Sequence, residues 1–435
     1  MARPPTRHPF GILGAVQALP TQIVETLVPA RLGKSFRWLL GSTIANNAGD
    51  GVVIAAGPLL VASQTRDPLL VSLALLMEYL PALLFGVIGG AAADRFDRKR
   101  MVVAANLGRS FMLAVLVATI ATGTVNIALV LVALFGLGTA EAFADSASST
   151  LLPGLVRRED LGIANARMQG GLLLTNQLLT PPIGAFLFAI GMALPFATNA
   201  VCFALGAVLI SRVAAPRRSD REERGSFRAE MAEGIRWLLG HPPMRTLCLT
   251  ILAFNVTFGA AWSVLVLYAG ERLHMDAVGF GLLTTAIAIG GIIGVTSYGR
   301  LERRFSMADI LRVGLVIETL THLVLALTTV PQIALLTFVV FGAHEFVWGT
   351  IVTVVRQRGV PDELLGRVSG VYRVAIVGGL VVGTPLGGLL ARTFGITAPF
   401  WFGFFGSALL VAILWREFEQ IAHSGDVVAV AEPAG

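Results

Sequence analysis

The stretch Gly90-Ala91-Ala92-Ala93-Asp94-Arg95-Phe96-Asp97-Arg98-Lys99-Arg100 places six charged residues within seven positions, between two long apolar segments. The flanking segments, 69–93 and 101–121, are each long enough to cross a hydrocarbon core of about 30 Å at about 1.5 Å of helix per residue. Charged side chains are costly inside that core. Residues 94–100, which we call the charged turn, are therefore predicted to form a tight turn at a membrane surface.

The composition excludes a soluble globular protein. Of the 435 residues, 55% are hydrophobic and only 14% are charged, and the mean hydropathy is +0.76. Both cysteines, Cys202 and Cys248, fall inside apolar segments, so neither a disulfide framework nor a zinc site is expected. No phosphate-binding loop or zinc-protease signature is complete. We expect a protein that is not an enzyme and that needs no metal and no cofactor.

Apolar segments of membrane-spanning length recur along the whole chain, and twelve of them are predicted to be helices. They lie near residues 38–63, 69–93, 101–121, 126–150, 167–189, 194–212, 246–270, 278–298, 310–328, 332–354, 368–391 and 397–415. An even number of spans places both termini on the same side of the membrane.

The distribution of basic residues predicts the orientation of these spans. Nearly all arginines and lysines fall in the loops on the side of the two termini, whereas the opposite loops hold only Arg66, Arg272 and Arg392. Basic loops stay in the cytoplasm during insertion. We therefore expect a multi-pass protein of a bacterial inner membrane with both termini cytoplasmic. The net charge of +6 then reflects topology and not binding to nucleic acid.

The chain also repeats itself. Residues 37–51 match 245–259, and residues 180–184 match 384–388, at nearly one offset. We therefore expect two six-helix halves joined by a polar segment. The predicted divisions are an N-terminal cytoplasmic extension at 1–36, a first bundle at 37–213, a cytoplasmic central loop at 214–243, a second bundle at 244–416 and a cytoplasmic tail at 417–435.

The charged turn resembles the loop between helices two and three of the major facilitator superfamily. The matching residues are Gly90, Asp94, Arg95, Arg98, Lys99 and Arg100. Asp97 stands where the general pattern has glycine, a variant typical of the branch that holds enterobactin exporters and macrolide efflux pumps. Residues 356–368 resemble the loop before helix eleven of the same branch, and the resemblance extends over residues 36–416. The alternative is a basic stop-transfer loop, which explains the arginines but not the position of Asp94.

This resemblance implies an all-α membrane protein whose twelve transmembrane helices form two pseudo-symmetric six-helix bundles. It implies a secondary active transporter that exports small amphipathic molecules of the drug, antibiotic or siderophore type. The partners are then a small-molecule substrate, protons and the lipid bilayer, and we expect a monomer. A conformational latch is implied at Gly90, Asp94, Arg95, Arg98 and Arg100. The antiporter motif of helix five is only partly present at 180–185, which leaves proton coupling open.

Ionisable residues inside the spans are the candidates for function, because each is costly in hydrocarbon. Glu141 and Asp145 lie one helical turn apart, so their like charges repel and favour binding of a proton or cation. We predict proton coupling at Asp50, Arg109, Glu141 and Asp145. We predict substrate binding at Asn47, Glu78, Asp145, Ser149, Asn255, His344, Glu345 and Trp348.

Several alternatives remain open from the sequence alone. Asp50 could be a buried carboxylate paired with an arginine for packing only. Glu318 and His322, also one turn apart, are expected near a helix end. A nutrient or metabolite importer would share the fold, and a non-transporting membrane receptor or scaffold would keep the fold without the coupling acids.

Overall fold

The computed structural model describes residues 30–214 and 227–418, apart from a few side chains that include that of Asp94. In the first part the helices are α2 (Gly33–Gln64), α3 (Pro68–Arg95), α4 (Arg98–Ala121), α5 (Ile127–Ser149), α6 (Leu161–Leu172), the π-helical segment η4 (Leu173–Leu179), α7 (Thr180–Ile190) and α8 (Leu194–Ser211). In the second part they are α9 (Phe227–Gly240), α10 (Pro242–Trp262), α11 (Leu265–Glu271), α12 (Ala277–Arg304), α13 (Met307–Leu327), α14 (Pro331–Gly359), α15 (Asp362–Phe394) and α16 (Ala398–Leu414). Short 3-10 turns lie at Ala30–Leu32, Leu152–Gly154 and Arg158–Asp160.

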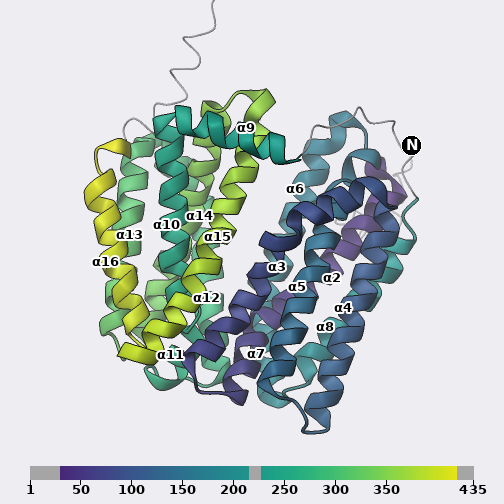
Figure 1. Cartoon of the computed structure of the whole chain (residues 1–435), viewed down its shortest axis with the longest axis horizontal. Helices are drawn as coiled ribbons and strands as arrows, with labels where there is room; N and C mark the ends of the chain where they lie inside the picture. The colour runs from purple at the N-terminus through teal and green to yellow at the C-terminus, as the bar shows by residue number, and fades with distance from the viewer. Residues whose placement is uncertain (1–29, 215–226, 419–435) are drawn as a thin grey trace, which may run out of the picture.

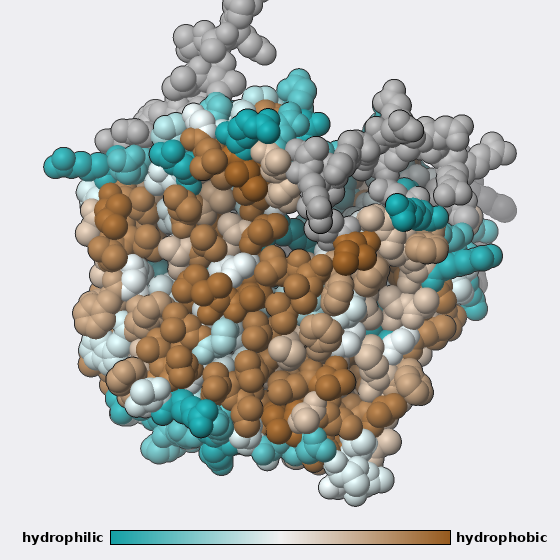
Figure 2. Space-filling view, viewed as in Figure 1, coloured by the Kyte–Doolittle hydropathy of each residue, from teal (hydrophilic) through white to brown (hydrophobic). Residues whose placement is uncertain are grey.

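These helices form two bundles side by side, α2–α8 in one and α10–α16 in the other (Figure 1). Within the described residues, eleven helical segments are long and apolar enough to cross a membrane, and the shorter apolar helix α16 has 17 residues. Brown apolar side chains cover the middle of the visible face between hydrophilic ends (Figure 2). Such a belt lets the bundles lie in lipid, because helices satisfy their backbone hydrogen bonds internally. The predicted fold of two six-helix bundles is confirmed.

Equivalent close contacts relate the two bundles. Gly51 of α2 lies against Thr180, and Gly259 of α10 lies against the backbone at Leu380 and Thr384. A Cβ atom at either glycine would collide with the facing helix or press tightly against it, so the small residue sets how closely the helices approach. The sequence repeat therefore corresponds to a repeated helix-packing interface.

Basic residues cap the helix ends in both bundles. Lys99 Nζ donates to the backbone oxygen of Val213 at 2.8 Å, just after α8, and Arg312 Nε donates to the backbone oxygen of Trp415 at 2.8 Å, just after α16. Carbonyl groups at the C-terminal end of a helix have no partner within the helix, and a cation there is favourable. We call this end of the molecule, which also holds the charged turn, the arginine-rich end.

The two bundles meet at the opposite, arginine-poor end. There α3 packs against α15 and α7 packs against α12. Gly388 contacts Ser72, and Gly281 contacts the Cβ atom of Ala185, so small residues allow both crossings to be tight.

Two ion pairs also join the bundles at this end. Arg66 Nη1 lies 3.9 Å from Glu271 Oε1, and Arg392 Nη1 lies 3.6 Å from Asp67 Oδ2. All four residues lie in connections or last turns of helices, and each bundle contributes one acid and one base. The arginine-poor end is thus held closed by packing and by charge.

Candidate functional site

Three helices bring Asp50, Arg109 and Glu141 together in the middle of the first bundle. Arg109 of α4 donates through Nη2 to Asp50 Oδ1 of α2 at 3.2 Å and to Glu141 Oε2 of α5 at 3.2 Å. The side chain of Arg109 is 5% exposed, that of Asp50 27% and that of Glu141 46%. One guanidinium therefore bonds to two carboxylates. We call Asp50, Arg109 and Glu141 the Arg109 cluster.

The aromatic ring of Phe203 and a pair of amides surround this cluster. The guanidinium carbon of Arg109 lies 3.9 Å from the centroid of the Phe203 ring on α8, a cation–π contact. One turn away, Asn46 Nδ2 donates to Asn106 Oδ1 at 3.2 Å, again between α2 and α4. Arg109 is thus in contact with side chains from three neighbouring helices, which fixes the position of its charge.

The acidic stripe on α5 continues from the cluster toward the second bundle. Asp145 and Ser149 follow Glu141 at one-turn intervals, and both are exposed. Asp145 lies within electrostatic reach of Arg109 and of Arg373 on α15. Glu78 of α3 is also exposed and lies within reach of Glu141. Of the acids of the first bundle, Asp145 therefore lies near a basic residue of the other bundle.

The two predicted asparagines occupy equivalent places in α2 and α10. Asn47 Nδ2 donates to the backbone oxygen of Thr43 at 2.8 Å, and Asn255 Nδ2 donates to that of Ile251 at 2.8 Å. Each side chain is half-buried and bonds to its own helix. The structure does not place either asparagine in the Arg109 cluster.

In the second bundle the predicted residues of α14 divide into two groups. His344 and Trp348 are buried, and Trp348 stacks on Phe254 of α10 with ring centroids 5.9 Å apart. Glu345 is half-buried and lies within electrostatic reach of Tyr79 on α3. Only Glu345 of these three thus faces the first bundle.

Glu318 lies in the middle of α13, so the expectation that it would lie near a helix end is wrong. His322 lies one turn further on, five residues before α13 ends at Leu327, and both side chains are buried, with Glu318 0% exposed. The pattern of polar and apolar residues could not show that these side chains are buried, because every face of α13 is largely apolar in sequence.

The residues of the charged turn lie at the arginine-rich end. Arg98 donates to the backbone oxygens of Ala93 and Thr150, and Asp97 caps α4 by accepting from the amide of Arg100 at 2.9 Å. Arg95 and Arg100 are exposed, and the space beside Gly90 is open. The side chain of Asp94 lies outside the described part of the structure. The turn is therefore at least a helix-capping element of the first bundle.

Sequence reasoning missed three residues that lie near the Arg109 cluster or Asp145. They are Arg373, which faces Asp145, and Asn106 and Phe203, which contact the cluster or its neighbours. The signal for Arg373 was present, because it is a basic residue inside the apolar segment 368–391. No such signal marks Phe203, since one phenylalanine in an apolar helix is ordinary.

Two bundles of membrane-spanning helices, one of which holds an ion-pair cluster, are the architecture of transporters of the major facilitator superfamily, which are not enzymes. A family model described as "Transmembrane secretion effector" matches residues 25–426. The chain belongs to this family.

Relatives of known name are transporters as well. The chain is 29% identical over 381 residues to the multidrug efflux pump Tap of Mycolicibacterium fortuitum, covering 83% of this chain and 90% of that protein. It is 28% identical over 317 residues to the enterobactin exporter EntS of Citrobacter koseri, covering 70% and 72%.

Among solved structures, the fold is similar to that of a bacterial homologue of the iron transporter ferroportin. The inward-facing state of that protein gives a TM-score of 0.70 at 18% identity, covering 89% of this chain and 98% of the other. Its outward-facing state with soaked iron gives 0.58, covering 89% and 99%. The helices of this chain are thus arranged more like those of the inward-facing state.

Proposed function

We propose that this protein exports small amphipathic molecules across a bacterial inner membrane in exchange for protons. The observation that carries the proposal is the Arg109 cluster, in which one permanent cation is shared by two carboxylates within the spans. The names of the relatives, a multidrug efflux pump and an enterobactin exporter, support the direction of transport and the class of substrate.

Charge counting explains how the cluster could couple to protons. With both carboxylates ionised, the Arg109 cluster carries one net negative charge, which is costly in a low-dielectric interior. One bound proton makes the cluster neutral. A cationic substrate near Asp145 would relieve the same negative charge, so proton and substrate compete, and competition of this kind is what exchange requires.

The substrate would bind between the bundles. The proposed contacts are Asn47, Glu78, Asp145, Ser149, Asn255 and Glu345, and two of them support this placement, since Asp145 lies within electrostatic reach of Arg373 and Glu345 within reach of Tyr79 in the opposite bundle. Their acids suit a cationic group, and the apolar helix faces around them suit the rest of an amphipathic molecule. His344 and Trp348 lie buried behind this surface and would support it from the second bundle.

Transport would proceed by rocking of the two bundles. The arginine-poor end is closed by Arg66–Glu271 and Asp67–Arg392, which fits a state that is open toward the arginine-rich end. We propose that the arginine-rich end is cytoplasmic, because basic loops stay inside. The opposite state would close at that end, where Asp94 is our proposed latch.

The test is accumulation of ethidium, a fluorescent amphipathic cation, in a deletion strain and in a strain that overexpresses the protein. We expect the overexpressing strain to accumulate less ethidium, and a protonophore to abolish the difference. Greater accumulation on overexpression would indicate import. No difference for ethidium or for any compound in a panel of neutral and anionic amphipaths would favour a non-transporting protein.

A further inference from the structure

The second bundle contains a buried group of titratable side chains that export through the Arg109 cluster does not use. Glu318 of α13 is 0% exposed, and the side chains of His322 and His344 are 4% and 3% exposed. We propose that Glu318, His322 and His344 form a second proton-binding site, which lies entirely within the second bundle.

The geometry gives each carboxylate oxygen its own imidazole. His322 Nε2 lies 3.0 Å from Glu318 Oε1, one turn along α13, and His344 Nε2 of α14 lies 3.7 Å from Glu318 Oε2. The first distance is a hydrogen bond, and the second is a looser approach that leaves Glu318 Oε2 and His344 Nε2 without a hydrogen-bond partner. The site therefore has unused capacity to hold a proton between α13 and α14.

Among the described residues around this site, no other charge balances the carboxylate. The helix α13 packs mainly against α14 and α16, and Phe258, Ala261 and Trp262 of α10 line the cavity beside His322; none of these three residues is ionisable, and α16 contains no ionisable residue. Apart from the two histidines, the titratable group within electrostatic reach of Glu318 is Glu345 of α14, which is also acidic. An ionised carboxylate buried in a span needs a positive partner. One proton held within the group, on the carboxylate or on an imidazole, makes the three side chains neutral together, and a remaining basic nitrogen can bind a further proton.

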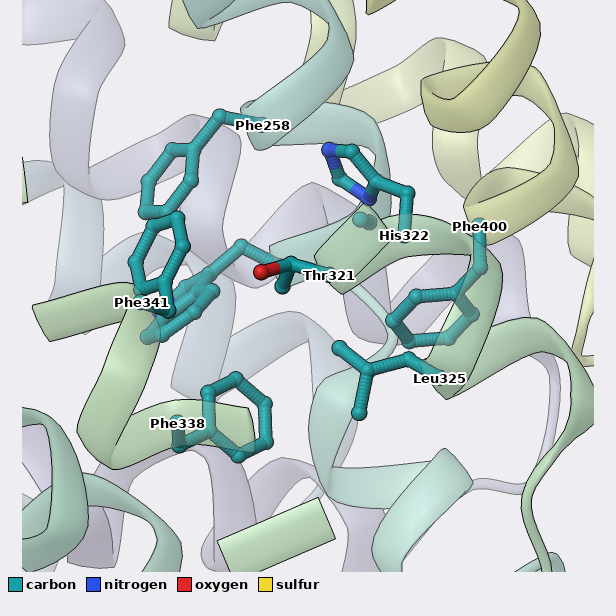
Figure 3. A pocket seen from close by; sticks show the side chains of 9 residues that line it. Phe258, Thr321, His322, Leu325, Phe338, Phe341 and Phe400 are labelled. Carbon is teal, nitrogen blue, oxygen red and sulfur yellow. The ribbon is translucent and has the colours of Figure 1, made fainter. Parts of the chain in front are cut away.

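Close helix packing seals this site from water. His322 lies against Gly403 of α16, and His344 lies against Gly314 of α13, in each case so closely that a Cβ atom at the glycine would press into the ring. On another side of His322 is a cavity of about 10 Å³, roughly the space of one water molecule. Its lining is mainly aromatic, and includes Phe338 and Phe400 (Figure 3). A proton can therefore enter or leave only when α13 moves relative to α14 or α16.

This proposal does not rest on the direction of transport or on the Arg109 cluster. It adds a second proton-binding site in the bundle that does not hold the Arg109 cluster. This site gains or loses a proton only when the helices move. A failed export assay would leave it intact, because the measurement below follows histidine protonation in the purified protein and not transport.

The test is a pH titration by NMR of the full-length protein in detergent micelles, with the histidine ring nitrogens labelled with ¹⁵N. H322Q and H344Q assign the two signals. H241Q, which removes an exposed imidazole at the end of α9, is the matched control. We expect the signals of His322 and His344 to change together with pH. In E318Q, the pH at which they change should fall by about one unit, a tenfold change in proton concentration.

Three results would overturn the proposal. Signals of His322 and His344 that keep one protonation state throughout the titration would show a purely structural hydrogen-bond network, and titrations unchanged in E318Q would show that the carboxylate does not act on them. If E318Q fails to fold, H322Q is measured for its effect on His344, and the reverse. No effect of either histidine on the other would mean that they share no site.

Discussion

Each bundle holds a carboxylate inside the membrane, but the partners of that carboxylate differ. The first bundle contains the Arg109 cluster, and the second contains Glu318, His322 and His344, which we call the Glu318 group. In the first bundle the partner is an arginine, which is permanently charged. In the second it is a pair of histidines, whose imidazole rings can be neutral or charged. The acids of the Arg109 cluster are partly exposed, whereas the Glu318 group is sealed.

The difference shows how a repeated fold can divide two tasks. At the offset of 204 residues that relates Thr180 to Thr384, Glu141 corresponds to Glu345. Both glutamates lie within electrostatic reach of Tyr79 on α3, but among the described residues only Glu141 pairs with an arginine. In our proposal the first bundle therefore presents a fixed charge pattern to the substrate, and the second keeps the histidines of the Glu318 group buried within the bundle.

The largest effect is expected for Arg109→Ala. This change leaves Asp50 and Glu141 without their cation inside the span, and breaking such a buried pair costs about 3–5 kcal/mol in the free energy of unfolding. We expect ethidium efflux to fall on the order of 100-fold or more, which corresponds to about 2.7 kcal/mol. The measurement is efflux from cells with expression matched by immunoblot.

Arg109→Lys is the matched control for this change, because it keeps the charge but not the two-pronged geometry. It should recover expression but only part of the rate, since one ammonium cannot reproduce the planar contacts to both carboxylates and to Phe203. Wild-type transport by Arg109→Ala would show that the cluster serves neither coupling nor stability.

The next effect is expected for Asp145→Asn, which removes the exposed acid that faces Arg373. Efflux driven by a pH gradient should be lost, while exchange of labelled substrate down its own gradient should continue. Glu141→Gln should instead narrow the range of substrates toward uncharged ones. The measurement is transport in proteoliposomes with and without an imposed pH gradient. If Asp145→Asn responds to the gradient as the wild type does, coupling lies elsewhere, and Asp50 with Arg109 becomes the leading candidate.

The sequence predicted the fold well and the site only in part. Three features of the sequence were enough to predict twelve helices in two bundles: the charged turn, the uneven distribution of arginines between the loops, and the internal repeat. Each is a pattern along the chain that indicates membrane topology. Asp50, Arg109 and Glu141 could be named individually as costly intramembrane charges. That they meet at one guanidinium depends on how α2, α4 and α5 rotate against each other, and spacing within one helix does not contain that information.

The same limit explains why the sequence could not show that Glu318 and His322 are buried. Their spacing of four residues correctly placed them on one face of α13, but which face meets α14 depends on contacts such as Gly314 with His344. Residues 227–240 also form helix α9, within a segment described from sequence as a loop. Its residue Glu233 pairs with Arg367 of α15 at 2.7 Å, a contact that only tertiary packing provides.

A smaller effect is expected from reversing the ion pair between Arg66 and Glu271. An exposed pair of this kind is worth about 0.2–1 kcal/mol, so Arg66→Glu should change the ratio of closed to open arginine-poor ends by about 1.4- to fivefold. Electron paramagnetic resonance between spin labels at Ser63 and Thr393 measures that ratio, in a chain with both native cysteines replaced by serine. The charge swap Arg66→Glu with Glu271→Arg should restore the ratio. Failure of the swap to restore it would show that packing alone closes this end.

The smallest effect is expected for Arg100→Ala. Arg100 is exposed, and Arg98 and Lys99 make the helix-capping bonds of the charged turn. Efflux should therefore stay close to the wild-type rate. Asp94→Asn, measured beside it at equal expression, should cut transport severely if Asp94 is the latch. Equal rates for the two variants would reduce the turn to a topology signal.

The most direct test of export by proton exchange uses inside-out membrane vesicles that hold the wild-type protein and are acidified inside by respiration. Adding ethidium should release part of the proton gradient, as followed by a pH-sensitive fluorophore, and vesicles with Arg109→Ala should show no such release. If ethidium accumulates in wild-type vesicles while the proton gradient stays unchanged, proton exchange is not the driving reaction. If neither accumulation nor proton release occurs with ethidium or any other amphipathic cation, the export of such molecules is contradicted.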